Sequence, residues 1–172
     1  MKMNFIAPLT AGILLAAAGA AQAATKTATF QVTASVVDNC IINANPLNFL
    51  TFDGSTDINN VETTITVRCT SGTDYSIALN AGQTGSFTGR RMVNPLSSTG
   101  IPLVYNLYTT EARDFVWGDD SGSTDVVPGV GAGMASGNAV THRVYGELLA
   151  SNNDGAIDVG SYTDVITATI TY

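Results

Sequence analysis

Charged residues are scarce in this chain of 172 residues, of which 45% are hydrophobic and only 12% are charged. Intrinsically disordered chains have the opposite balance, so the composition excludes a disordered protein. Basic residues are the scarcer sign, with seven against fourteen acidic residues and a net charge of −7. Because an acidic surface repels phosphate groups, this balance argues against a nucleic-acid-binding protein. The pairing of many apolar with few charged residues fits a β protein whose surface is covered by a partner.

Side chains that carry catalysis or bind metals are also few. The only histidine, His142, lies beside Arg143 in an alternating run, and no G-x-S-x-G motif occurs. We expect a strand histidine that is exposed or hydrogen-bonded, and neither catalytic residues nor a cofactor. Asp119, Asp120 and Asp125 flank a Ser-Gly-Ser-Thr stretch, which we interpret as a polar turn rather than a calcium site. The sequence thus predicts neither an enzyme nor a metal protein.

The longest apolar stretch lies near the start of the sequence. Lys2 precedes the apolar run Phe5–Ala20, and Ala21-Gln22-Ala23 forms an A-x-A cleavage signal. The run is shorter than the ~20 residues that a membrane-spanning helix needs. We therefore predict a secretory signal peptide over residues 1–23, removed after Ala23, and no membrane span in the mature chain.

Export gives a role to the two cysteines. Cys40 and Cys69 are the only pair, and an exported chain meets an oxidising compartment. A catalytic or metal-binding thiol would need a CxxC motif or more nitrogen ligands, and the sequence offers neither. We predict a structural disulfide between them, which contributes about 3.6 kcal/mol on the loop-entropy estimate.

A period of two dominates the rest of the chain, and no window shows a convincing helical period. Short alternating runs separated by turn signals predict an all-β sandwich or barrel. A glycine-rich segment, Gly118–Thr141, either hides a short strand near Asp125–Val127 or forms a mobile loop. Arg90-Arg91 is a lone basic pair that we expect in a solvated turn. The expected strands are Thr25–Val37, Glu62–Thr70, Tyr75–Asn80, Ser86–Val93, Leu103–Thr109, Asp114–Trp117, His142–Ala150 and Tyr162–Tyr172.

The first alternating run, Thr25–Val37, is too long for one strand of a small sandwich. At about 3.3 Å per residue it extends about 43 Å, against about 17–20 Å for a usual strand. Its first half could project as a free amphipathic arm, or it could fold back into its own domain. Its even positions are apolar, at Ala28, Phe30, Val32, Ala34 and Val36.

The final run, Tyr162–Tyr172, also alternates and continues in phase to the last residue. Asp164, Ile166, Ala168, Ile170 and Tyr172 share one face. An unpaired edge of this kind drives association, and a free strand elsewhere in the chain could fill it. Because such a head-to-tail contact does not close, it would produce a fibre.

At this point the sequence resembles the spore coat protein U domain, the subunit family of archaic (Csu-type) chaperone–usher pili. The resemblance covers essentially the whole mature chain, and the order of its motifs is more specific than any one of them. Leu50 departs from the pattern, because the family often has Gly after the Phe. The matching motifs are residues 30–37 leading to Cys40, 46–49, 65–69 with Gly72, Tyr75, 79–82, 91–92, 103–108, 117–118, 145–146, 160–164 and the aromatic Tyr172.

The resemblance implies an incomplete immunoglobulin-like β-sandwich that a donor strand from a neighbouring subunit completes. In such pili a periplasmic chaperone lends a strand to the open groove, and an outer-membrane usher exchanges it for the arm of the next subunit. Ala28, Phe30, Val32 and Ala34 would then form the donor strand. The groove edge and the chaperone contact would comprise Ile166, Ala168, Ile170 and Tyr172.

The domain organisation that follows is a signal peptide (1–23), a donor-strand arm (24–33) and a single pilin domain (34–172). The implied function is a structural subunit of a secreted pilus at the cell surface, which supports surface attachment and biofilm formation. Two alternatives stay open: the tip adhesin of the same pilus, and a secreted coat protein that does not polymerise.

Overall fold

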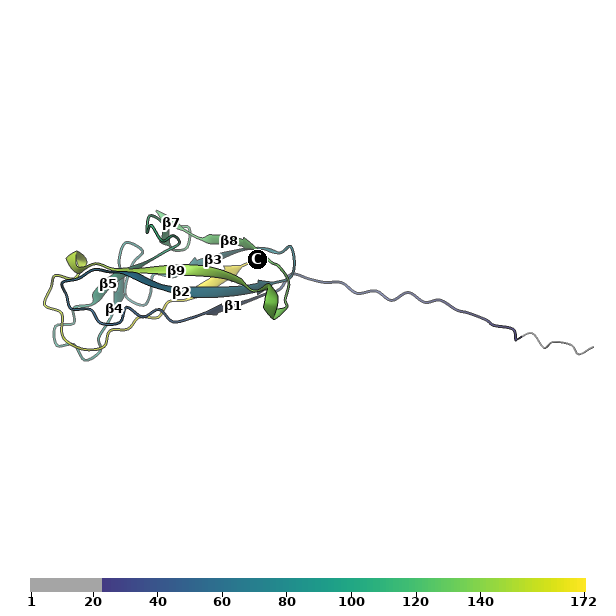
Figure 1. Cartoon of the computed structure of the whole chain (residues 1–172), viewed down its shortest axis with the longest axis horizontal. Coiled ribbons are helices and arrows are strands. Elements are labelled where there is room, and N and C mark those ends of the chain that lie inside the picture. Colours follow the sequence, from purple (N-terminus) through teal and green to yellow (C-terminus); the bar gives the residue numbers. More distant parts are fainter. Residues whose placement is uncertain (1–22) are drawn as a thin grey trace, which may run out of the picture. The chain divides into compact units, whose positions relative to one another are not determined.

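A computed structural model describes residues 23–172 of the chain. The predicted signal peptide lies almost entirely outside the described residues. Val36–Tyr172 forms one compact unit, and the preceding residues are described separately. Residues 23–172 contain no α-helix, and their strands form a seven-stranded and a three-stranded sheet (Figure 1). The predicted all-β class is confirmed.

The larger sheet has the strand order β1-β2-β9-β5-β6-β7, with β4 paired to β5, and the smaller sheet has the order β10-β3-β8. Only the β6–β7 pair is parallel. The elements are β1 (Cys40–Ala44), β2 (Ile58–Cys69), β3 (Asp74–Leu79), β4 (Arg90–Met92), β5 (Leu103–Tyr108), β6 (Val116–Trp117), β7 (Thr124–Asp125), β8 (Val127–Val130), β9 (Val140–Leu148), β10 (Ala168–Thr171) and the 3₁₀ turns Ser136–Asn138 and Ala150–Asn152.

Alternate residues of the central strands form the core between the two sheets. In β2 the buried residues are Ile65, Val67 and Cys69, which follow the period of two in the sequence. Trp117 of β6 is fully buried, and its indole Nε1 donates a hydrogen bond to the carbonyl of Ile77 at 2.9 Å. Each such side chain contributes about 1.5–3 kcal/mol on burial, so these strands hold the sheets together.

The glycine-rich segment contains strands, so the mobile-loop alternative is wrong. β7 and β8 both lie within it, next to the expected position. Gly129 of β8 lies against the ring of Tyr75, where a Cβ atom would come within 2.3 Å of the ring carbon Cζ. A larger side chain at position 129 would clash with the ring of Tyr75. The strand therefore has a glycine here and shows no period of two in the sequence.

The expectation that Arg90-Arg91 forms a solvated turn is wrong for Arg90. Its side chain is fully buried, and burial lowers its pKa. The guanidinium donates to the carbonyls of Asn80 at 2.9 and 3.0 Å and of Trp117 at 2.6 Å, and to Oδ1 of Asn106 at 2.6 Å. Arg90 therefore ties β4 to the ends of β3 and β6, while Arg91 is exposed.

Residues 23–39 form no strand, although the alternation predicted one over Thr25–Val37. Every residue from 23 to 39 is exposed, including Phe30 at 87% and Val32 at 82%. A strand needs a hydrogen-bonded neighbour, and residues 23–39 form no strand pairing. The projecting arm therefore stays a prediction.

Candidate functional site

Two edge strands, one from each sheet, each have a side that pairs with no other strand. β1 pairs only with β2, and β10 pairs only with β3, among the described residues. The two edges belong to different sheets, and β1 and β10 lie close together without pairing. The sandwich is thus open between them, and a strand placed there would meet unused backbone donors and acceptors on both sides.

A groove with a volume of about 420 Å³ runs between these edges. Its lining is mostly apolar, with the edge-to-face pair Phe49 and Tyr105 at a ring-centroid distance of 5.6 Å. We call it the acceptor groove. It is lined by residues 44–47, Phe49, Thr63, Ile65, Leu79, Met92, Tyr105, Leu107, Val144, Asp164, Ile166 and Ala168.

Asp164 is the one charged residue in this lining, and its hydrogen bonds are satisfied. Oδ2 accepts a bond from the hydroxyl of Tyr105 at 2.8 Å. Oδ1 accepts bonds from the backbone N–H groups of Gln83 at 2.9 Å and Val165 at 2.8 Å. Burial, with the bond to Asp164, raises the pKa of Tyr105, so its hydroxyl remains a donor. The groove therefore has a hydrogen-bonded carboxylate at Asp164 and a mostly apolar remainder.

The C-terminal residues predicted at the groove edge divide into two groups. Ile166 and Ala168 line the groove, and both are half-buried. Ile170 packs against the core beyond the groove lining, and Tyr172 is 56% exposed. The predicted inward face is therefore present, although regular pairing is restricted to β10 and an isolated bridge between Val93 and Thr163.

The opposite wall was not predicted, because its residues show no alternation. β1 and the extended residues after it contribute Ala44, Pro46, Leu47 and Phe49. The pairing of Ala44 with Ile65 places this wall beside β2. The signal available in the sequence was the cysteine pair, because it fixes the start of β1 against the end of β2.

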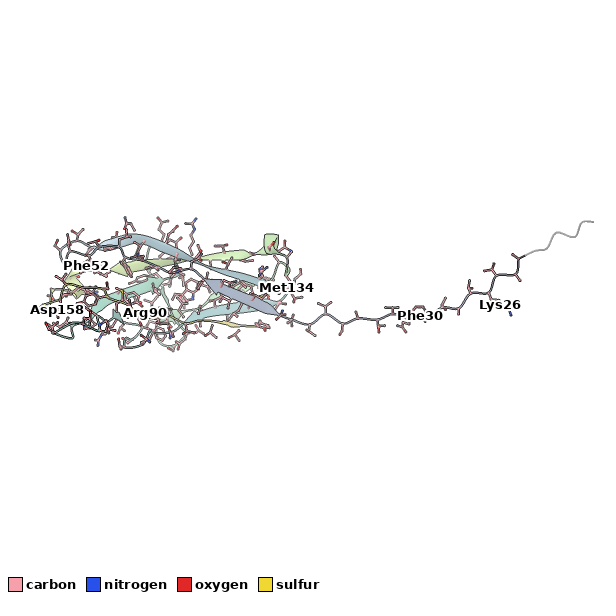
Figure 2. The ribbon with its side chains drawn as sticks, turned by 90° about the horizontal axis from the view of Figure 1, so that it is seen from below. Lys26, Phe30, Phe52, Arg90, Met134 and Asp158 are labelled. Atoms are coloured by element: carbon pink, nitrogen blue, oxygen red, sulfur yellow. A yellow bond between two sulfur atoms is a disulfide. The ribbon has the colours of Figure 1, made fainter. Side chains whose placement is uncertain are left out.

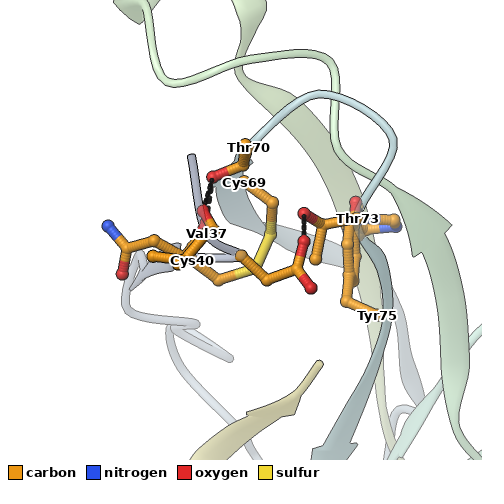
Figure 3. The surroundings of a disulfide bond; sticks show 9 residues. Val37, Cys40, Cys69, Thr70, Thr73 and Tyr75 are labelled. Atoms are coloured by element: carbon orange, nitrogen blue, oxygen red, sulfur yellow. Dashed lines mark hydrogen bonds between the residues drawn. A yellow bond between two sulfur atoms is a disulfide. The ribbon is translucent and has the colours of Figure 1, made fainter. Parts of the chain in front are cut away.

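The predicted disulfide between Cys40 and Cys69 is present (Figure 3). These cysteines are also register partners of β1 and β2. Just before Cys40, the carbonyl of Val37 accepts a bond from Oγ1 of Thr70 at 3.2 Å, and Oδ1 of Asp38 accepts one from Thr73 at 2.7 Å. The chain is therefore fixed to the domain from Val37 onward.

The polar residues considered for chemistry have structural partners. Nε2 of His142 lies 2.9 Å from the hydroxyl of Tyr75, and burial lowers the pKa of this histidine. Asp119 accepts a bond from the backbone N–H of Ser121 at 3.1 Å, as in a polar turn. Residues 23–172 contain no group of three or more candidate metal ligands, and none of their helices could span a membrane.

Comparison with known proteins links this architecture to one family. The model of the Spore Coat Protein U domain matches residues 26–169. Protein U of Myxococcus xanthus is 33% identical over 183 residues, an alignment that covers 97% of this chain and 96% of that protein.

A solved structure supports the fold assignment. It is the complex of CsuC with CsuE, a chaperone–tip adhesion subunit pre-assembly complex from archaic chaperone-usher Csu pili of Acinetobacter baumannii. One of its chains matches with a TM-score of 0.53 and 19% identity, over 80% of this chain and 40% of that one. At this identity the likeness shows the fold alone, which is an immunoglobulin-like β-sandwich.

Proposed function

Because the chain belongs to the Spore Coat Protein U domain family, as its sequence motifs indicated, we propose that it is a pilus subunit that polymerises by donor-strand exchange. The family is one of structural subunits rather than enzymes. The observation that carries the proposal is the acceptor groove, an apolar opening between two unpaired strand edges. A polymer forms when an extended segment of another copy fills that opening.

The segment proposed to fill the groove is the arm, residues 24–33, together with Ala34 at its boundary. Its apolar face is exposed in the lone chain and would be buried in a neighbour. Burial of Phe30 and Val32 would contribute roughly 1.5–3 kcal/mol each, before any backbone hydrogen bonds are counted. Residues 34–172 would then form the pilin domain.

The remaining partners follow from the same proposal. An open groove exposes apolar surface in the free subunit, so a periplasmic chaperone would cover it before assembly, and an outer-membrane usher would direct the exchange. The assembled fibre would lie at the cell surface and support attachment and biofilm formation. Ile170 lies within β10 and Tyr172 directly follows it, and neither lines the groove. These two residues would extend the contact with the chaperone.

Deletion of Ala24–Val32 from the mature protein, with the chaperone present, tests the proposal. We expect folded subunits and no long polymers, visible by electron microscopy. A matched pair of full-length variants sharpens the test, because Phe30→Asp places a charge on the apolar face and Thr29→Asp places the same charge on the polar face. Polymerisation should be lost in the first variant only. Long polymers of the deleted subunit would show that the arm hypothesis is wrong.

Two other functions predict different results in these experiments. A tip adhesin would accept an arm but would not need to donate one, so deletion would leave its incorporation unchanged. A coat protein is the second candidate, since the family whose model matches residues 26–169 is named for a spore coat protein. A coat protein that does not polymerise through the groove would give neither polymers nor a dependence on Phe30.

A further inference from the structure

Two sulfur atoms in the described part of the chain are open to oxidation, the thioethers of Met92 and Met134. Both cysteines of the sequence are joined in the disulfide, so no thiol competes with these thioethers for an oxidant. Met92 and Met134 are both half-buried. Oxidation to the sulfoxide turns a flexible apolar side chain into a polar one, so its effect depends on what surrounds each methionine.

Met92 lies where two hollows of the domain meet. It is the last residue of β4, it packs against the core, and it lines both the acceptor groove and a second hollow of about 710 Å³. Leu47 and Phe49 are the other two residues that line both, so the junction of the hollows is apolar. Met134 lines neither hollow. Figure 2 shows Met134 at the opposite end of the domain from Asp158, a residue of the second hollow.

The side-chain hydrogen-bond donors in the groove lining already have acceptors. They belong to Asn45, Thr63 and Tyr105. Nδ2 of Asn45 donates to a threonine hydroxyl at 2.9 Å, and Oγ1 of Thr63 donates to the carbonyl of Asn45 at 3.1 Å. The hydroxyl of Tyr105 donates to Asp164 at 2.8 Å. Unused backbone donors lie on the strand edges, where an occupant of the groove would take them. A sulfoxide oxygen at the junction therefore depends on water for its hydrogen bonds.

An occupied groove would remove that water. In the free chain, a half-buried sulfoxide beside an open groove keeps its hydration. An apolar segment in the groove would cover the junction and leave the sulfoxide oxygen without a donor, and burying an unpaired polar group is costly. The same segment would shield the reduced sulfur from an oxidant. Oxidation of Met92 and occupation of the groove therefore oppose each other.

We propose that Met92 is a site of reversible oxidation by peroxides, which lowers the affinity of the acceptor groove for the segment that fills it; the inference rests on the proposed function. A lone pair of the sulfur attacks one peroxide oxygen, so that an S–O bond forms as the O–O bond breaks. The sulfur loses two electrons and the peroxide gains them. With hydrogen peroxide, the proton of the transferred oxygen passes to the leaving hydroxide, which gives water. Methionine sulfoxide reductases reverse the change.

Peroxide treatment of the mature chain tests this inference, with a labelled peptide of residues 24–36 as the probe of the groove. We expect oxidised wild type to bind the peptide about tenfold more weakly, because the sulfoxide loses its water on binding, and a sulfoxide reductase to restore the affinity. Met92→Leu keeps the volume and apolar character of the side chain, so its affinity should not respond to peroxide. Met134→Leu is the matched control and should lose affinity as wild type does. Circular dichroism verifies that the oxidised chains remain folded.

Mass spectrometry adds a measurement that needs no variant. Saturation with the peptide should slow the gain of oxygen at Met92 and leave the gain at Met134 unchanged. Equal affinity of untreated wild type and of a chain oxidised at Met92 would overturn the oxidation site alone. A loss of affinity that persists in Met92→Leu would overturn it as well. A peptide that fails to bind untreated wild type would overturn the groove proposal, and with it the effect of oxidation.

Discussion

Leu50 has a backbone conformation that glycine adopts more easily than leucine. Its φ angle is 61°, and its N–H donates a hydrogen bond to Oδ1 of Asn48 at 2.7 Å. The left-handed conformation costs a residue with a Cβ atom about 1–2 kcal/mol, and the exposed leucine side chain returns little of it by burial. Leu50, where the sequence departs from the family pattern, is therefore a strained position in the folded chain.

We expect Leu50→Gly to stabilise the domain by about 1 kcal/mol, because relief of strain exceeds the entropy that glycine adds to the unfolded chain. Urea denaturation measures the difference. The control is Leu96→Gly, at an exposed position that does not have a positive φ angle, where glycine should be neutral or destabilising. A loss of stability in both variants would contradict the assignment of strain.

The guanidinium of Arg90 stabilises the domain by donating hydrogen bonds to uncharged oxygen atoms rather than by forming an ion pair. We expect Arg90→Met to lower the free energy of unfolding by at least about 3 kcal/mol, since three acceptor groups lose their donor at about 1–3 kcal/mol each. Arg91→Met, at the exposed neighbour, should change it by less than about 0.5 kcal/mol. Thermal unfolding of both variants makes the comparison, and equal effects would be inconsistent with the buried role of Arg90.

Asp158 makes the stability of the loop that it binds, residues 97–99, dependent on pH. Hydrogen bonds from the N–H of Thr99 and the hydroxyl of Ser97, with further bonds from Ser98, lower the pKa of Asp158 from 3.8 to about 2. Because the folded pKa lies below the unfolded one, the stabilisation is complete above about pH 4 and is lost as the pH falls toward 2. NMR titration of its carboxyl carbon should give a midpoint near 2. Asp158→Asn should remove part of the stability at pH 7 and none below pH 2.

Among the secondary-structure elements, strands with one buried face could be predicted from the sequence. Strands that exist because of their pairing with a neighbouring strand could not. The period of two located β2, β3, β5 and β9, because each places alternate side chains in the core. β1 lacks that pattern, since it lies at a sheet edge and most of its side chains are exposed. The expected strand Ser86–Val93 is reduced to β4 because Ser86 and Gly89 form a tight turn.

The candidate site was predictable to the same partial extent. The even face of the C-terminal segment is visible in the sequence, and Ile166 and Ala168 do line the groove. The floor of the groove comes from Leu79, Leu107 and Val144, whose proximity depends on the sheet order rather than on any local pattern. The sequence thus indicates one wall, while only the fold brings the other wall and the floor beside it.

The disulfide fixes an edge strand that has few other contacts. β1 has one neighbouring strand, so the bond between Cys40 and Cys69 stabilises it where hydrogen bonding is one-sided. We expect the Cys40→Ser, Cys69→Ser double variant to lose about 2–5 kcal/mol of unfolding free energy. Urea denaturation of wild type with and without reductant checks this value, and the double variant should not respond to reductant. A reductant-independent wild type would contradict the prediction.

For the whole molecule, an open groove means that the free chain is less stable than a chain whose groove is occupied. Part of its core is covered only when another segment occupies the groove, so any ligand of the groove shifts the folding equilibrium toward the native state. If the proposed function holds, this coupling connects folding to assembly. It also makes stability a measure of groove occupancy that does not require fibres to form.

A peptide of residues 24–36 should therefore stabilise the full-length subunit by about 2.7 kcal/mol when its free concentration is a hundredfold above its dissociation constant. Thermal unfolding at rising peptide concentration measures this effect. A peptide with Phe30→Ser and Val32→Ser should have little effect, because it retains the backbone groups but lacks the apolar side chains that fill the groove. A peptide with Thr29→Ala and Gln31→Ala changes only the opposite face and should act like wild type. Equal stabilisation by all three peptides would mean that the arm does not recognise the groove through its apolar face.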